Sequence, residues 1–297
     1  MLINAYQHSF LHKITLKNMP FYPQQPGSIG VFDSGYGGLT ILHGIQQVLP
    51  EYDYIYLGDN ARAPYGSRSF EVVYEFTRQA VLKLFEMGCH LVILGCNTAS
   101  AKALRTIQQN DLPKLAPDRR VLGVIRPTAE VIGSLTSSRH VGILATEGTI
   151  RSQSYNIEIQ KQSPDIQVTG LSCPLWVPII ENNEADSPGA DYFVKKRIDH
   201  IMRLDPQIDT LILGCTHYPI LMPKILKYVD RGVKIVPQGE YVAASLKDYL
   251  HRHPEMDERC TKHSSTKYYT TESPTKFKEN ARIFMPEEIN VERITLE

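Results

Sequence analysis

The sequence predicts an α/β fold of two similar parallel-sheet domains, related by a pseudo-two-fold axis, with the active site in the cleft between them. Apolar strand segments alternate with glycine-rich turns and helical segments, which is typical of parallel sheets joined by right-handed crossovers. The second half repeats the plan of the first: IGVFDSGYGG resembles VGILATEGTI, and LVILGCNTAS resembles TLILGCTHYP. The offsets are similar, 112 residues from Gly30 to Gly142 and 119 from Cys96 to Cys215, so each half is expected to end one strand in Gly-Cys.

In the first half, short apolar segments bounded by turn residues predict strands. These segments are 28–32, 54–57, 90–94 and 121–125. Apolar residues at helical spacing predict helices between the strands. The helices cover 41–48, 70–87 and a segment that follows GCNTAS and runs through residue 107.

The second half gives the same alternation. Its predicted strands are 140–144, 167–170, 210–213 and 234–236. Its predicted helices follow ATEGTI to about residue 162, cover 192–204, follow GCTHYP, and cover 239–251. The remaining residues predict a strand–helix–strand tail, because KYYTT and NVERITL flank a helix that begins at Ser273-Pro274. Serine at the N-cap and proline at the first helical position are strong start signals.

The composition excludes several classes of function. The chain has 297 residues, of which 42% are hydrophobic, and Lys+Arg and Asp+Glu both number 32. A formal net charge of zero argues against a nucleic-acid partner or a membrane-surface role. No segment has the roughly 20 apolar residues that span a bilayer, and residues 1–27 show no signal peptide. The five cysteines include no Cys-x-x-Cys pair, which predicts a reduced protein of the cytoplasm.

Cys96 and Cys215 are the candidate reactive groups. In open α/β sheets, ligands bind beyond the carboxyl ends of the strands, and both cysteines lie there, just before a helix. A helix N-terminus favours negative charge and can lower the pKa of either thiol. Many free cysteines are only buried apolar residues, and Cys89, Cys173 and Cys260, which lack this context, are interpreted in that way. Two opposed thiols suit racemisation, in which one face of a carbon loses a proton and the other face receives one.

Polar residues next to the cysteines support this chemistry. Asn97 and Thr98, like Thr216 and His217, are expected in a first helical turn, where backbone N–H groups and side chains can bind a carboxylate. Asp33 and His217 can each orient or activate one thiol. The alternatives are that Asp33 is a helix N-cap and that His217 makes a structural hydrogen bond.

Four further features have simpler interpretations by themselves. Ala-Pro-Tyr-Gly at 63–66 is a turn signature, and Thr146 and Thr149 are typical helix-capping residues. GYGG at 35–38 lacks the spacing of a phosphate-binding loop and predicts a tight strand-to-helix turn. Cys-Thr-His at 215–217 is too compact for the usual zinc ligand spacing, so no metal is expected.

Taken together, the motifs resemble those of the glutamate racemases, in the aspartate/glutamate racemase superfamily. The resemblance runs in order from about Ser28 to the C-terminus through IGVFDSGYGGLT, YLGDNARAPYGSRS, LVILGCNTAS, GVIRPTAE, VGILATEGTIRS, CPLWVPIIE and LILGCTHYPIL. It implies an enzyme that works without pyridoxal phosphate or any other cofactor, is cytoplasmic and homodimeric, and supplies D-glutamate for peptidoglycan. It also implies that the last part of the chain returns to the first domain. The expected division is an extension at 1–27, a first domain at 28–125 with 239–297, and a second domain at 126–238.

The resemblance also implies a role for individual residues. Cys96 would take the proton from D-glutamate and Cys215 would act on L-glutamate, with Asp33 and His217 assisting them. The implied substrate-binding residues are Asp33, Ser34, Tyr65, Gly66, Asn97, Thr98, Thr146, Thr149, Glu181, Thr216 and His217.

One segment departs from the family pattern. Pro237-Gln238-Gly239 stands where many members carry an Asp-Ser-Gly type sequence, so different contacts are expected at this crossing between domains.

Other functions fit the same pattern less well. A racemase of another acidic amino acid, such as aspartate, is the nearest alternative, whereas the related decarboxylases keep only one of the two cysteines. A non-catalytic two-domain binding protein would not need a thiol on each side. A hydrolase that pairs Cys215 with His217 is disfavoured, because positions i and i+2 of a helix do not face each other.

Overall fold

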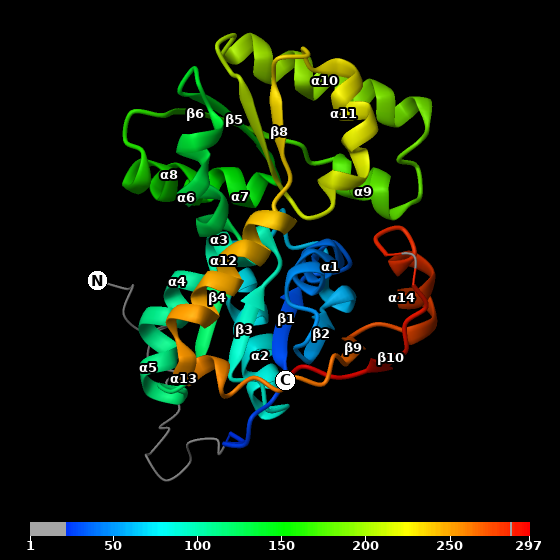
Figure 1. Cartoon of the computed structure of the whole chain (residues 1–297). Helices are drawn as coiled ribbons and strands as arrows, with labels where there is room; N and C mark the ends of the chain where they lie inside the picture. The colour runs from blue at the N-terminus through cyan, green and yellow to red at the C-terminus, as the bar shows by residue number, and fades with distance from the viewer. Residues whose placement is uncertain (1–21, 286) are drawn as a thin grey trace, which may run out of the picture.

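The computed structural model describes residues 22–285 and 287–297. In Figure 1 the chain forms two α/β domains, one above the other, with the chain ends of the described part in the lower one. Residues 1–21 of the predicted extension lie outside the described residues. Tyr22 packs edge-on against Phe85, with ring centroids 5.6 Å apart, and Gly27 pairs with Cys260 through an isolated parallel bridge. Residues 22–27 are therefore attached to the lower domain.

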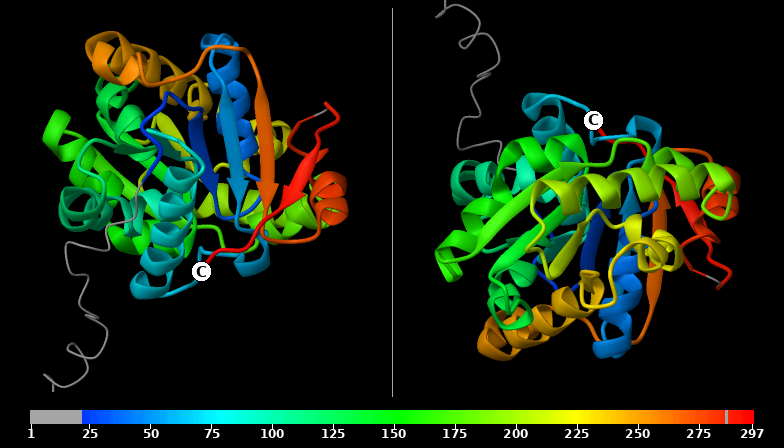
Figure 2. Two further views of the ribbon diagram at one scale, coloured as in Figure 1. Left: turned by 90° about the horizontal axis from the view of Figure 1, so that it is seen from below. Right: turned by 90° about the horizontal axis from the view of Figure 1, so that it is seen from above.

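The lower domain contains a six-stranded sheet. Its strands are β1 (Ile29–Asp33), β2 (Tyr54–Gly58), β3 (Leu91–Leu94), β4 (Arg120–Gly123), β9 (Thr266–Thr270) and β10 (Val291–Arg293). The order is β10-β9-β2-β1-β3-β4, and every neighbouring pair is parallel. All residues of β1, β2 and β3 are buried, as expected for strands covered by helices on both faces. Figure 2 shows that β9 and β10 continue the sheet beside β2, as the predicted tail requires.

The upper domain has a four-stranded sheet of the same plan. Its strands are β5 (His140–Ala145), β6 (Gln167–Ser172), β7 (Thr210–Gly214) and β8 (Lys234–Val236). The parallel order β6-β5-β7-β8 repeats the order β2-β1-β3-β4 of the lower domain. The predicted fold class of two similar parallel-sheet domains is therefore confirmed.

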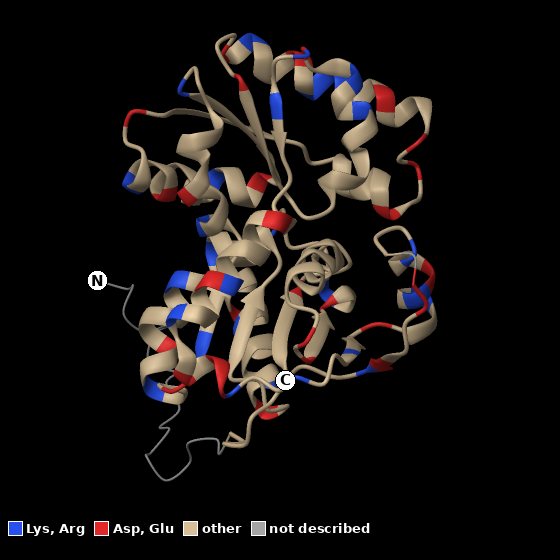
Figure 3. Cartoon of the chain, viewed as in Figure 1, with Lys and Arg blue, Asp and Glu red and all other residues tan. Residues whose placement is uncertain are grey.

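Helices cover both sheets. The lower domain has α1 (Gly38–Val48), η2 (Asn60–Arg62), α2 (Phe70–Glu86), α3 (Asn97–Lys102), α4 (Leu104–Thr106), η3 (Ile107–Asp111), α5 (Leu112–Leu115), α12 (Gly239–Arg252), α13 (Pro254–Asp257) and α14 (Pro274–Ala281). The upper domain has α6 (Ile125–Leu135), α7 (Glu147–Ser152), α8 (Ser154–Gln162), α9 (Trp176–Glu181), α10 (Pro188–Leu204), η4 (Tyr218–Leu221) and α11 (Met222–Tyr228). Among the described residues, no helix is both long enough and apolar enough to cross a membrane. Charged residues of both signs are interspersed over the outer helices in the view of Figure 3.

Some predicted boundaries were wrong. The segment predicted as a strand to residue 125 ends at Gly123, because Ile125 already begins α6, a helix that was not predicted. The buried residues Ile125, Ala129 and Ile132 of α6 recur at helical spacing, which is the signal that was missed. Helix α9 was also not predicted, and α10 begins at Pro188, earlier than expected, because Ser187 caps it.

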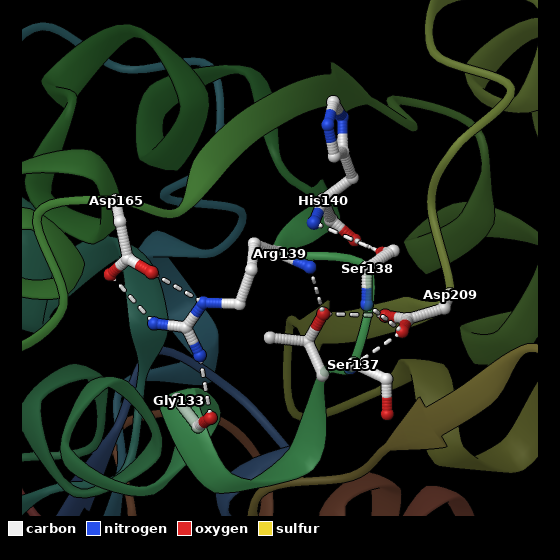
Figure 4. Close-up of polar contacts among 8 residues, drawn as sticks. Gly133, Ser137, Ser138, Arg139, His140, Asp165 and Asp209 are labelled. Carbon is white, nitrogen blue, oxygen red and sulfur yellow. Dashed lines mark hydrogen bonds and ion pairs between the residues drawn. The ribbon is translucent and has the colours of Figure 1, made fainter.

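A polar cluster fixes the turn that leads from α6 into β5 (Figure 4). The carboxylate of Asp209 accepts hydrogen bonds from the backbone N–H groups of Ser137 and Ser138, each at 2.7 Å, and from the hydroxyl of Thr136 at 2.6 Å. Arg139 makes two hydrogen bonds of 2.7 Å to Asp165. These contacts hold the amino end of β5, and the opposite end of the strand is left to carry residues of the candidate site.

Candidate functional site

Cys96 is the second residue after β3 and is the N-cap residue of α3. Its sulfur accepts a hydrogen bond from the Ala99 backbone N–H at 3.4 Å and lies 3.4 Å from Ser34 Oγ. Burial, together with the nearby charge of Asp33, raises the pKa of the Cys96 thiol to about 12. The predicted lowering of this pKa by the helix N-terminus is therefore wrong, because the loss of water around the sulfur outweighs the effect of a short helix.

Cys215 lies directly beyond β7, at the position equivalent to Cys96. The helix that follows is η4, which begins only at Tyr218, so Thr216 and His217 do not occupy a first helical turn as predicted. They form a turn in which the Tyr218 N–H donates to the Cys215 carbonyl at 3.1 Å. This turn brings His217 Nδ1 to 3.9 Å from the Cys215 sulfur. The geometric argument against a Cys215–His217 contact was therefore wrong, because it assumed a helix at these positions.

His217 is held between Cys215 and Glu181. Its Nε2 lies 2.9 Å from Glu181 Oε1, and its ring meets Phe284 edge-to-face at a centroid distance of 5.1 Å. Burial by itself lowers the pKa of His217, but the hydrogen bonds to Cys215 and Glu181 outweigh burial and raise it above the ordinary value. An imidazolium ion at this position is a cationic partner for the sulfur of Cys215.

Asp33 ends β1 and faces the same region. It is buried, and its Oδ1 accepts a hydrogen bond from the Gly35 N–H at 2.8 Å. Burial raises the pKa of this carboxyl group, and His217 and the Gly35 N–H offset part of that rise. The N-cap position of α1 is Gly37, so the alternative role of Asp33 as its N-cap does not hold.

Gly37 lies at a close approach between the two domains. A Cβ atom at Gly37 would lie 2.3 Å from both His217 Nδ1 and Thr216 Oγ1. The DSGYGG turn of the lower domain therefore packs directly on the segment that follows Cys215. Only glycine permits this approach.

Three threonines join the domains beside Cys96. Thr98 Oγ1 lies 2.9 Å from Thr146 Oγ1 and 3.5 Å from Thr149 Oγ1. Thr146 is also the N-cap residue of α7, because its hydroxyl accepts from the Thr149 N–H at 3.4 Å. The capping role and the position between the domains are thus compatible.

Tyr65 and Gly66 lie beside the same threonines. The Gly66 carbonyl accepts from the Gly148 N–H at 2.8 Å, and a Cβ at Gly66 would lie 3.0 Å from the Thr146 Cβ. The Tyr65 hydroxyl donates to Asp59, which was not predicted. Asp59 follows the buried strand β2 directly, and this position was the only signal that could have identified it.

Asn97 makes its side-chain hydrogen bonds to protein groups that were also not predicted. Its Nδ2 donates to Gln238 at 2.6 Å, and its Oδ1 accepts from the Tyr155 hydroxyl at 2.7 Å. Phe284, from the C-terminal tail, was missed as well, because its contact with His217 spans two distant segments.

The structure thus brings all the predicted site residues to the junction of the two sheets. Both thiols are buried, each at 6% exposure, and each lies just beyond the carboxyl end of an equivalent strand. Two thiols with separate polar partners can exchange protons with one carbon atom between them. Within residues 22–285 and 287–297, no group of three or more His, Cys, Asp or Glu side chains could hold a metal ion.

Comparisons with known proteins agree with this arrangement. The family described as Asp/Glu/Hydantoin racemase matches residues 38–245. A glutamate racemase of Streptococcus agalactiae is 39% identical over 269 residues, covering 90% of this chain and 98% of the relative. One from Roseobacter denitrificans is 39% identical over 268 residues, covering 87% and 96%.

Solved structures agree as well. A glutamate racemase of Bacillus anthracis superposes with a TM-score of 0.81 at 33% identity, covering 91% of this chain and 98% of that one. The enzyme of Francisella tularensis, solved in complex with D-glutamate, also gives 0.81 at 33% identity, covering 92% and 98%. The chain therefore belongs to the Asp/Glu/Hydantoin racemase family of isomerases and, within it, groups with the glutamate racemases.

Proposed function

We propose that this enzyme interconverts L-glutamate and D-glutamate without a cofactor. Cys96 and Cys215 exchange protons with opposite faces of Cα. The observation that carries the proposal is the placement of the two thiols. Cys96 is the second residue after β3, and Cys215 is the first residue after the equivalent strand β7. Each thiol has its own polar partners. The site lies between the domain of 28–125 with 239–297 and the domain of 126–238.

In the direction from L-glutamate, Cys215 acts as the base. The His217 imidazolium stabilises a Cys215 thiolate, and the raised pKa of Cys96 keeps its thiol protonated. The Cys215 thiolate removes the Cα proton, so that the Cα–H bond breaks and an S–H bond forms. The Cys96 thiol then delivers its proton to the opposite face of Cα.

In the direction from D-glutamate, Cys96 acts as the base. Its thiolate accepts hydrogen bonds from Ser34 and from the Ala99 N–H. Asp33 assists on this side, as Glu181 does through His217 on the other. The substrate carboxylates would be bound by the polar groups that surround the thiols, namely Ser34, Tyr65, Gly66, Asn97, Thr98, Thr146, Thr149, Thr216 and His217.

This assignment refines two of those roles. The Tyr65 hydroxyl is bonded to Asp59, so Tyr65 contributes its ring and backbone. The Asn97 side chain is bonded to Gln238 and Tyr155, so its backbone N–H at the start of α3 is the better ligand for an anion.

The wider setting follows from the same assignment. We propose that the protein is a cytoplasmic homodimer whose D-glutamate enters peptidoglycan synthesis. Sedimentation of the purified chain tests the dimer, and complementation of a bacterial strain that requires D-glutamate tests the biological role.

The decisive assay uses L-glutamate in D₂O with no added cofactor. We expect inversion, seen by polarimetry, and replacement of the Cα proton by deuterium, seen by ¹H NMR. L-aspartate in the same assay separates glutamate from the other acidic amino acid. Folded protein with free thiols that shows neither exchange nor inversion of glutamate would refute the proposal.

A further inference from the structure

Three buried side chains form a closed ring of hydrogen bonds at the crossing between the domains. Asn97 Nδ2 donates to Gln238 Oε1 at 2.6 Å, Gln238 Nε2 donates to the Tyr155 hydroxyl at 2.6 Å, and that hydroxyl donates to Asn97 Oδ1 at 2.7 Å. All three residues are 3% exposed or less. Each side chain in the ring both donates and accepts, so its polar groups are satisfied away from water.

Gln238 also makes a hydrogen bond between the two segments where the chain crosses from one domain to the other. It lies between β8 and α12, and Val124 lies between β4 and α6. The Gln238 Nε2 contacts the Val124 carbonyl at 3.0 Å and Thr128 Oγ1 at 3.3 Å. A carboxylate cannot make these donations, and a serine or asparagine is shorter. The two N–H bonds of the glutamine amide fit the two shorter contacts, to the Tyr155 hydroxyl at 2.6 Å and to the Val124 carbonyl at 3.0 Å.

The ring reaches both thiols through their neighbours in the chain. Asn97 follows Cys96 directly. On the other side, the Tyr155 ring packs against Gly214, where a Cβ atom would lie 3.2 Å from Tyr155 Cε2, and Gly214 directly precedes Cys215. One set of hydrogen bonds therefore fixes the end of β3 relative to the end of β7.

We propose that Gln238 is a positioning residue that sets the alignment of Cys96 and Cys215 across the substrate. It acts through Asn97 and Tyr155 and touches neither thiol. This inference rests on the proposed function, because proton transfer on opposite faces of Cα needs both sulfurs in reach of one carbon. A displacement of about 1 Å in such a site can lower the rate about 100-fold. The 237–239 segment is also the point at which the chain departs from the family pattern.

The test measures Gln238→Leu, Tyr155→Phe and the double variant. We expect each single variant to lose about tenfold in kcat, with KM changed less than about threefold, because alignment rather than binding is lost. The double variant should also lose about tenfold rather than about 100-fold, because the ring acts as a unit. Gln46→Leu is the matched control: Gln46 is half-buried and donates to Thr266 at 2.9 Å far from the ring, so its kcat should stay at the wild-type value.

A second measurement needs no activity. Iodoacetamide labelling, followed by mass spectrometry of the peptides, reports the accessibility of each cysteine. We expect Gln238→Leu to label Cys96 and Cys215 at least about threefold faster than wild type, with Cys89 and Cys260 unchanged, because the net loss of even one buried hydrogen bond corresponds to a several-fold change. Additive losses in the double variant, or wild-type kcat with wild-type labelling in Gln238→Leu, would overturn the inference. A wild-type protein without racemase activity would refute the proposed function instead, and the labelling would still test the ring.

Discussion

The two halves of the site are equivalent in fold but different in chemistry. Cys96 caps a helix, accepts hydrogen bonds from neutral groups and lies beside the buried carboxyl group of Asp33. Cys215 lies in a turn and contacts His217, which is paired with Glu181. One half therefore surrounds its sulfur with neutral hydrogen-bonding groups, and the other places an imidazole beside its sulfur. The difference shows that two strand ends of the same fold can give their cysteines different electrostatic surroundings.

Burial alone does not distinguish these two thiols from the other cysteines of the chain. The pKa values of Cys89 and Cys260 are raised by burial to about 12, as is that of Cys96. What sets Cys96 and Cys215 apart is their place at a strand end and the polar groups around them. The comparison between the halves, and between them and the other cysteines, can be tested directly.

The largest expected effect comes from removing either thiol. Cys96→Ser and Cys215→Ser should each lower racemisation by at least about 1,000-fold in both directions, because each direction uses one sulfur as base and the other as acid. Polarimetry measures the loss, and thermal unfolding should stay close to wild type. Near-normal turnover in either variant would break the two-base mechanism.

The next effect separates the halves. His217→Asn and Asp33→Asn should each lower kcat by about 100-fold. Enantiomers have equal free energies, so kcat/KM must fall equally in both directions and cannot reveal which half is damaged. The primary isotope effect on removal of the Cα proton can reveal which half is damaged. With α-deuterated substrates, His217→Asn should raise it for L-glutamate and lower it for D-glutamate, and Asp33→Asn should do the reverse; the same pattern in both variants would contradict separate halves.

A smaller effect concerns pH. The pKa of His217 is raised above the ordinary value of about 6.5. The imidazole therefore keeps its positive charge above pH 6.5 and loses it only as the pH rises through the raised pKa. Glu181→Gln should lower this pKa only in part, because the contact with Cys215 also raises it, so kcat should begin to fall at a lower pH than in the wild type, with a loss of up to about tenfold at alkaline pH. Histidine ¹⁵N NMR measures the titration. Ser34→Ala, which alters only the Cys96 half, should leave that titration unchanged. If Glu181→Gln does not shift the His217 titration, Glu181 does not raise the pKa of the imidazole.

The smallest effect is expected at a cysteine outside the site. Cys89→Ala should leave kcat at the wild-type value, and it should lower the free energy of unfolding by about 1 kcal/mol, because it removes one buried sulfur from the core. Urea unfolding and the racemisation assay measure the two quantities. A clear loss of turnover in a well-folded variant would show that burial in this core, rather than position at a strand end, matters for activity.

Local patterns in the sequence were enough to predict the fold class and the two candidate thiols. Short apolar strands fix an α/β plan because period and burial depend on local composition, and the repeated Gly-Cys endings identify equivalent strand ends. Helices α6 and α9 were not predicted, although the spacing of their apolar residues is a signal within each segment. The start of α10 at Ser187 was missed because this capping residue lies before the first apolar residues of the helical pattern. The residues next to each cysteine in the chain were found for the same reason, since chain neighbours remain neighbours in space.

Contacts between segments that are distant in the chain became visible only in the folded molecule. The ring of Asn97, Tyr155 and Gln238, the bond from Tyr65 to Asp59 and the packing of Phe284 on His217 all join separate segments, and nothing in the local pattern specifies them. The raised pKa of Cys96 belongs to the same class, because it depends on how much water the folded chain removes from the sulfur. Local sequence sets what each segment can form, and packing decides which side chains meet and in which state of charge.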